Sequence, residues 1–111
     1  MLSVNTLAQG NAQVITVKGR VDGFTAPQLD EALQTALKAK KYNVVVDLGE
    51  TEFMSSAGMR ALLSARLALQ DKSGDLRLAA PSDYLLDSLK LVGLDKLFKI
   101  YDSRNAAVAS F

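Results

Sequence analysis

The chain has 111 residues, of which 49% are hydrophobic and 23% are charged, and its 13 Lys and Arg residues nearly balance 12 Asp and Glu residues. This composition is typical of one globular domain with one core, over residues 1–111, and it does not indicate direct nucleic-acid binding. The sequence contains no Cys and no His, which excludes disulfides, thiol nucleophiles, Ser-His triads and most zinc sites.

The sequence shows no pattern of a signal peptide or of a membrane-spanning helix. The first residues, Met1-Leu2-Ser3-Val4-Asn5, lack the basic stretch and apolar run of a signal peptide. Nor does the sequence contain an uninterrupted apolar run long enough to span a bilayer. We therefore expect a soluble, cytoplasmic protein without membrane insertion.

The opening of the chain predicts two strands and a helix. Residues 2–7 and 13–18 have strand patterns, and Gln9-Gly10-Asn11 between them favours a hairpin turn. Thr25 is a suitable N-cap for the helix, with Gln28 at the capping-box spacing. The apolar stripe of this helix comprises Leu29, Ala32, Leu33, Ala36 and Leu37, and the helix ends at Lys40 and Lys41.

The middle of the chain predicts a buried strand and a second helix. Residues 42–48 contain the β-branched run Val44-Val45-Val46, which is typical of a strand buried on both faces. We expect Gly49 to end this strand. Helical spacing then returns at Met59, Leu62, Leu63 and Leu67, and the helix closes near residues 72–74.

The last third of the chain predicts strand, helix, strand and helix. Residues 75–80 alternate as a strand does, and Ser82 can cap a helix whose apolar face is Leu85, Leu86, Leu89 and Val92. Gly93 suits the left-handed residue after that helix, with Leu94 packing on Leu89. Residues 98–101 and 102–111 predict a short strand and a short terminal helix.

The predicted order is therefore β-β-α-β-α-β-α-β-α. Helical crossovers imply parallel strand pairs, and the opening hairpin adds an antiparallel pair. The fold class is an α/β layered domain with a mixed sheet and helices packed on it, in which Val44 to Val46 form an interior strand. We expect its core to include Leu33, Leu37, Val45, Leu62, Leu63, Leu78 and Leu89.

Three junctions follow the predicted strands, at residues 19–24, 50–58 and 81–83, where α/β proteins commonly meet ligands and partners. In the middle junction, Ser55 and Ser56 stand where the second helix begins. A serine there can simply cap the helix. The same free N–H groups also tolerate a phosphate, and Gly58 would let another molecule approach without a Cβ in the way.

These residues carry a family resemblance. Asp47-Leu48-Gly49 through Phe53-Met54-Ser55-Ser56-Ala57-Gly58-Met59 resembles the central signature of STAS domains of the anti-sigma factor antagonist type. Gly19-Arg20-Val21-Asp22, Thr25-Ala26 and Leu91-Val92-Gly93-Leu94 with Phe98 and Ile100 match other segments of that family, in order and over nearly the whole chain. Ser55, where many members have Asp, and Gly49-Glu50 depart from the commoner pattern.

The resemblance implies a partner-switching role. The unphosphorylated antagonist would bind an anti-sigma factor that is also a serine kinase, and so free a sigma factor. Phosphorylation of Ser56 would release it, with Ser55 as the alternative acceptor, and a PP2C-type phosphatase would reverse the mark. The implied partner-binding residues are Asp22, Gly23, Phe24, Met54, Ser55, Ser56, Gly58 and Met59.

Several of these residues also have a purely structural interpretation. Asp22 can be a solvated loop acid or a helix-side cap, whereas in similar antagonists this acid lies beside the acceptor loop. Phe24 can be a core residue or an exposed anchor of the kind enriched in binding hot spots. Asp47, Glu50 and Glu52 lack the alternating-acid loop of a calcium site, so solvated turn charges are favoured, with no metal and no cofactor.

Two other classes of function compete with the switch. One is a STAS accessory subunit docked on another partner, such as a lipid-transporting ABC permease, in which the serine need not be phosphorylated. The other is an enzyme. The sequence has neither a Ser-x-x-Lys motif nor a Gly-x-Ser-x-Gly nucleophile elbow, and we predict no catalytic residues.

Overall fold

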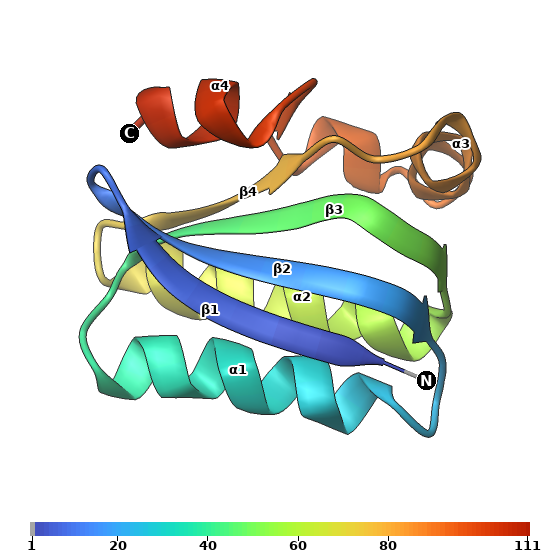
Figure 1. The fold of residues 1–111 in the computed structure, drawn as a ribbon, viewed down its shortest axis with the longest axis horizontal. Coiled ribbons are helices and arrows are strands. Elements are labelled where there is room, and N and C mark those ends of the chain that lie inside the picture. Colours follow the sequence, from blue (N-terminus) through green and yellow to red (C-terminus); the bar gives the residue numbers. More distant parts are fainter. Residues whose placement is uncertain (1) are drawn as a thin grey trace.

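After an opening pair of strands, helices and strands alternate along the chain (Figure 1). The computed structural model describes residues 2–111. The elements are β1 (Ser3–Gln9), β2 (Ala12–Val21), α1 (Ala26–Lys38), β3 (Asn43–Met54), α2 (Ser56–Asp71), β4 (Asp75–Ala79), α3 (Asp83–Leu91), the 3-10 turn η1 (Leu94–Lys96), β5 (Ile100–Tyr101) and α4 (Arg104–Ala109). This order confirms the predicted fold class.

The strands form one mixed sheet in the order β1-β2-β3-β4-β5. β1 and β2 are antiparallel, as predicted for the opening hairpin, and every later neighbouring pair is parallel. β3 therefore lies at the centre, and Val44, Val45 and Val46 are fully buried. Because the side chains of a strand alternate, Val44 and Val46 belong to one apolar cluster and Val45 to the other.

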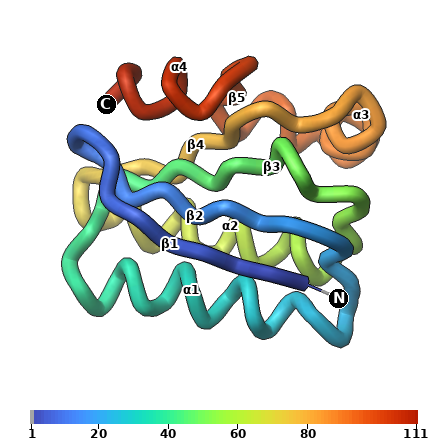
Figure 2. The backbone as a smooth tube through the Cα atoms, viewed as in Figure 1, coloured from blue at the N-terminus to red at the C-terminus, as the bar shows by residue number. Residues whose placement is uncertain are grey.

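Helices cover both faces of the sheet. α1 and α2 lie side by side on one face, whereas α4 lies on the other (Figures 1 and 2). The larger apolar cluster, under α1 and α2, also includes Leu85 and Leu89 of α3. The smaller cluster is closed by Ala107 of α4. Among the helices that the structure describes, none has the length and apolar character needed to cross a membrane.

Most of the predicted core is confirmed. Leu33, Val45, Leu62, Leu78 and Leu89 are buried. Leu37 and Leu63 are only partly buried at the margin of the larger cluster.

The apolar faces predicted for α2 and α3 were wrong in part, because Leu67 and Val92 are 58% and 59% exposed. The inward face of α2 instead consists of Gly58, Met59, Leu62, Ala65 and Leu69. Small residues on that face leave little hydrophobic signal in the sequence.

β2 and β3 are longer than predicted, and Gly49 does not end β3. The two strands stay paired as far as Val21 and Met54, through two register shifts. Near the first shift, the Thr51 hydroxyl donates to the Val17 carbonyl at 2.7 Å and so provides a hydrogen bond inside the irregular stretch. The junctions that we placed at residues 19–24 and 50–58 are therefore shorter, because both begin inside strands.

The helix ends give mixed outcomes. Ser82 caps α3 by accepting a hydrogen bond from the Leu85 N–H at 3.1 Å, and Gly93 is left-handed with φ of 77°, both as predicted. The capping box of α1 was wrong, since the Thr25 side chain makes no cap bond. The Gln28 side chain instead donates to the Leu2 carbonyl at 3.1 Å.

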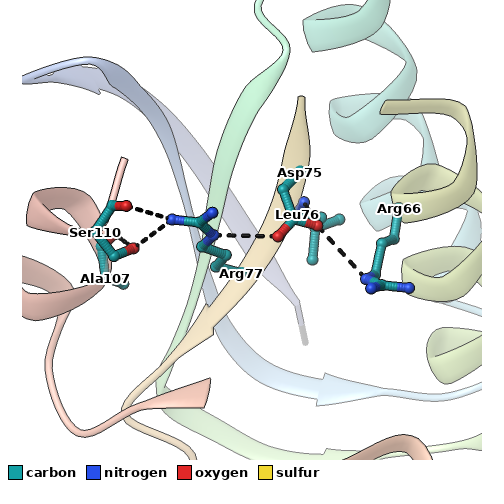
Figure 3. A network of polar contacts seen from close by, with 6 residues as sticks. All are labelled: Arg66, Asp75, Leu76, Arg77, Ala107 and Ser110. Atoms are coloured by element: carbon teal, nitrogen blue, oxygen red, sulfur yellow. Dashed lines mark hydrogen bonds and ion pairs between the residues drawn. The ribbon is translucent and has the colours of Figure 1, made fainter. Parts of the chain in front are cut away.

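A polar network connects elements on opposite faces of the sheet (Figure 3). Asp75, which is buried, lies 3.5 Å from Arg66 of α2 and 3.1 Å from Arg77 of β4. Arg77 also donates to the carbonyl and the hydroxyl of Ser110, just after α4, at 2.6 and 2.8 Å. This network lies at the end of the sheet where β3 and β4 begin, since Asn43 pairs with Asp75.

Candidate functional site

Two of the three junctions singled out from the sequence, those after β2 and β3, meet at one end of the sheet. Val21 and Met54 are paired at the ends of β2 and β3. The next residue, Ser55, donates its backbone N–H to the Val21 carbonyl at 2.7 Å. The turn before α1 and the start of α2 are therefore neighbours, at the right-hand edge of Figure 1.

Ser55 and Ser56 differ in structure although they are adjacent. Ser55 is the N-cap of α2, in an extended conformation, and its hydroxyl accepts from the Gly58 N–H at 3.4 Å. Ser56 is the first residue of α2 and is exposed. Within the described part of the chain, its hydroxyl makes no hydrogen bond to a side chain or to the backbone. Ser56 thus presents a free hydroxyl at a helix N-terminus, where backbone N–H groups and the helix dipole favour a negative charge.

Gly58 does not leave room for a partner, contrary to our interpretation. A Cβ built on Gly58 would lie 2.6 Å from Cγ1 of Val21 and 2.8 Å from Cγ of Met54. This glycine is buried, and it allows α2 to lie directly against the ends of β2 and β3. Met54 and Met59 are also buried, at 5% and 9% exposure. Met54 and Gly58 support the serine turn from below, so we withdraw the direct partner contact expected of these two residues. Met59 borders the hollow beside Ser56, and its partner contact stays a prediction.

Asp22 organises the turn beside the serines. One carboxylate oxygen accepts from the Phe24 and Thr25 backbone N–H groups, both at 2.9 Å, and lies 3.1 Å from the Thr25 hydroxyl. The Thr25 N–H, as the main cause, holds the pKa of the Asp22 carboxyl below its ordinary value. Asp22 therefore caps the turn that leads into α1, which is one of the two structural interpretations given for it above. The same hydrogen bonds fix the turn that lies beside the start of α2.

The tip of this turn is open to solvent. Phe24 is 94% exposed, so it is not the core residue that the sequence left as an alternative. A Cβ added to Gly23 would meet no atom within 4 Å. An aromatic ring held out of the core at this position is available to a partner, which is the remaining alternative for Phe24.

Two hollows flank the first turns of α2, with Arg60 on the border of both. One, of about 380 Å³, lies between α1 and α2 and includes Gly23, Asp30 and Ala57. The other, of about 210 Å³, is bounded by Ser56, Met59, Arg60, Leu63, Val92 and Leu94. Arg60 and Val92 were not among the site residues expected from the sequence, although the four-residue spacing from Ser56 to Arg60 was visible there.

The acidic residues weighed as a metal cluster are used elsewhere or stand alone. Asp47 pairs with Arg104 at 2.8 Å, and Glu50 lies 3.9 Å from Lys18. Over residues 2–111, no group of three or more acidic side chains is arranged to hold a metal ion.

Comparison with known proteins identifies the family. The sequence profile of the STAS domain matches residues 3–107, and the chain therefore belongs to the STAS domain family. The putative anti-sigma factor antagonist BtrV of Bordetella bronchiseptica is 30% identical over 98 residues, covering 88% of this chain and 84% of BtrV.

Solved structures agree with this assignment. An anti-sigma factor antagonist from Mycobacterium paratuberculosis superposes with a TM-score of 0.90 at 25% identity, covering 99% of this chain and 93% of its own. SpoIIAA of Bacillus in its phosphorylated form has the same fold, with a TM-score of 0.75 at 18% identity and coverage of 99% and 98%.

Proposed function

We propose that this protein is an anti-sigma factor antagonist whose binding to its partner is switched by phosphorylation of Ser56. The observation that carries the proposal is the free, exposed hydroxyl of Ser56 at the first position of α2, beside a serine that is already used as the cap. Relatives named as anti-sigma factor antagonists support the general role. A structural neighbour, SpoIIAA, is known in a phosphorylated form.

Ser56 is favoured over Ser55 as the acceptor for a structural reason. The Ser55 hydroxyl is partly buried and accepts the Gly58 N–H, so phosphorylating it would disturb the cap of α2. Modifying Ser56 requires no such rearrangement. The resident partner of the unphosphorylated form would be an anti-sigma factor with serine kinase activity, and a PP2C-type phosphatase would restore that form. In this role the protein acts in the cytoplasm and catalyses no reaction itself.

The partner-facing surface that we propose is the exposed part of this end of the sheet. It comprises Asp22, Gly23, Phe24, Ser55 and Ser56, with Met59 at its margin, and is supported from below by Met54 and Gly58. Phe24 supplies an apolar anchor, and the small side chain of Ser56 lets a second surface come close to the N-terminus of α2.

Phosphate would act at this interface and not by unfolding the domain. A phosphoserine carries about −1.5 to −2 charges at pH 7, and a negative charge at a helix N-terminus is favourable by about 0.3–1 kcal/mol. A partner fitted to a neutral hydroxyl would have to desolvate that charge. A hundredfold loss of affinity requires only about 2.7 kcal/mol, which is within the penalty for an unpaired buried charge.

Phosphopeptide mapping after incubation with ATP and candidate kinase-type anti-sigma factors tests the acceptor. We expect Ser56 to be modified to high occupancy, Ser56→Ala to remain unmodified, and the control Ser55→Ala to be modified still. Modification of Ser56→Ala would move the acceptor to Ser55. No modification of the native chain by any kinase would favour a passive docking subunit, for example on a permease.

Affinity measurements test the switch itself. The phosphorylated chain should bind the kinase at least about a hundredfold more weakly than the unphosphorylated chain, and its melting temperature should be no lower. Ser56→Ala should bind as tightly as the native chain and stay bound in the presence of ATP. Equal affinity with and without phosphate would contradict the switch.

A further inference from the structure

Arg60 differs from every other arginine in the described part of the chain. Arg20 lies over the Phe53 ring at 4.5 Å, and Arg104 pairs with Asp47 at 2.8 Å. Arg66 and Arg77 both pair with Asp75. Within residues 2–111, Arg60 has no carboxylate within 4.0 Å, no aromatic ring beneath it and no side-chain hydrogen bond, and it is exposed.

Its position relates it to Ser56. The two residues are four apart on α2 and border the same hollow, so their side chains lie on one face of the helix. The acidic residues nearby are engaged or lie apart. The Asp22 carboxylate accepts hydrogen bonds from its own turn. Asp30 of α1 borders the other hollow, and no ion pair among residues 2–111 joins it to Arg60.

We propose that Arg60 binds the phosphate of phosphorylated Ser56 within the same helix. The inference rests on the proposed function, because it takes Ser56 as the modified residue. An anion four residues before a cation is the favourable orientation of such a pair on a helix. The planar guanidinium can also donate two parallel hydrogen bonds to phosphate oxygens.

The pair would change the interface in two ways at once. The phosphate adds negative charge at the N-terminus of α2, and Arg60, exposed in the unmodified chain, is drawn to that phosphate. A partner that uses the exposed guanidinium loses it at the same moment. Arg60 is thus a positioning residue for the phosphate, with no part in transferring it.

The test uses the full chain with phosphoserine installed at position 56 by genetic code expansion, so that no kinase is needed. The second pKa of phosphoserine, ordinarily about 6, is followed by phosphorus-31 NMR as pH varies. We expect Arg60→Ala to raise this pKa by about 0.3, a twofold change in the proton dissociation constant. The difference should shrink in 1 M salt, where the Debye length is about 3 Å, and Arg60→Lys should give a smaller rise than Arg60→Ala.

Lys72→Ala is the matched control. It removes the same charge from the far end of α2, about 24 Å away along the helix axis, so the phosphoserine pKa should move by less than about 0.1. If the phosphoserine pKa is the same in the Arg60→Ala variant as in the Lys72→Ala variant, the proposal is overturned.

Urea unfolding gives a second readout that does not depend on titration. We compare the change in urea midpoint that phosphorylation causes in each chain. This change should be more positive in the native chain than in the Arg60→Ala variant. Equal shifts in the two chains would also contradict the pair. If the pair is found but no kinase modifies Ser56, the proposed function fails while the contact stands. If a kinase modifies Ser56 and neither readout responds to Arg60, only this inference fails.

Discussion

Gly58 stands two residues after Ser56, where α2 lies against the ends of β2 and β3. Gly58→Ala should lower the free energy of unfolding by about 1–3 kcal/mol, because the new methyl group would overlap Val21 and Met54. Urea denaturation measures this loss. Gly23→Ala is the matched control in the neighbouring turn, where a Cβ meets nothing within 4 Å, and should change stability by no more than about 0.5 kcal/mol. Equal effects of the two substitutions would show that α2 can move away from the sheet freely.

Asp22 makes the stability of the site turn sensitive to pH. Hydrogen bonds from the Thr25 and Phe24 N–H groups lower the pKa of its carboxyl in the folded state. That stabilisation is complete above the unfolded pKa of about 3.9 and is lost as pH falls through the lower folded value. Asp22→Asn, which keeps an acceptor oxygen but no charge, should therefore be less stable than the native chain at neutral pH. The gap should close at acid pH, as followed by urea unfolding, and a gap that stays constant would contradict this account.

At the scale of single residues, the sequence predicted where the candidate site residues lie better than it predicted the contacts that each of them makes. The position of Ser55 and Ser56 between strand and helix was readable from turn chemistry. Which of the two caps α2 depended on where the helix begins, and local patterns locate helix ends poorly. The space around Gly58 is filled by Val21, which is distant in sequence, so local reasoning could not reveal it.

α2 illustrates how an element buries one face and leaves another free. Leu62→Ala should lower the free energy of unfolding by about 2–5 kcal/mol, since Leu62 is fully buried between helix and sheet. Leu67→Ala, the same substitution on the same helix, should change it by no more than about 0.5 kcal/mol because Leu67 is 58% exposed. Leu63→Ala should fall between them, as Leu63 is partly buried. Chemical denaturation of the three variants checks the order, and a large loss for Leu67→Ala would mean that its face is covered by another molecule.

The predicted elements were correct in kind and order, and their ends were less accurate. β3 continues through Gly49 and Glu50 to Met54 because β2 lies beside it over the same distance. Such pairing depends on both strands, so the end of β3 could not be predicted from the local sequence of β3 alone. Local patterns also explain why Leu67 was wrongly placed on the inward face of α2. That face includes Gly58 and Ala65, and such small residues add little to the hydrophobic periodicity of the sequence.

For the whole molecule, the two ends of the sheet differ in what they contain. The end with Val21 and Met54 holds the candidate switch, and the end where β3 and β4 begin holds the network around Asp75 (Figure 3). The alternation of strands and helices was enough to predict the layered fold. The network was not predicted, because its members come from α2, β4 and the residue after α4, far apart in the sequence.

Asp75 links the two faces of the sheet, and its removal should be felt across the molecule. Asp75→Ala should lower the free energy of unfolding by about 3 kcal/mol, because Arg66 and Arg77, whose side chains are only 17% and 13% exposed, would be left without their carboxylate. Asp75→Asn should cost less, since its amide oxygen can still accept the Leu76 N–H.

Urea unfolding measures the loss, and Asp71→Ala is the control, because Asp71 is exposed at the end of α2. Hydrogen exchange should also quicken at Ala107 and Ser110, since Arg77 would hold the end of α4 less firmly without Asp75 to orient it. Losses no larger than that of Asp71→Ala, with unchanged exchange in α4, would mean that the two apolar clusters alone hold the helices on the sheet.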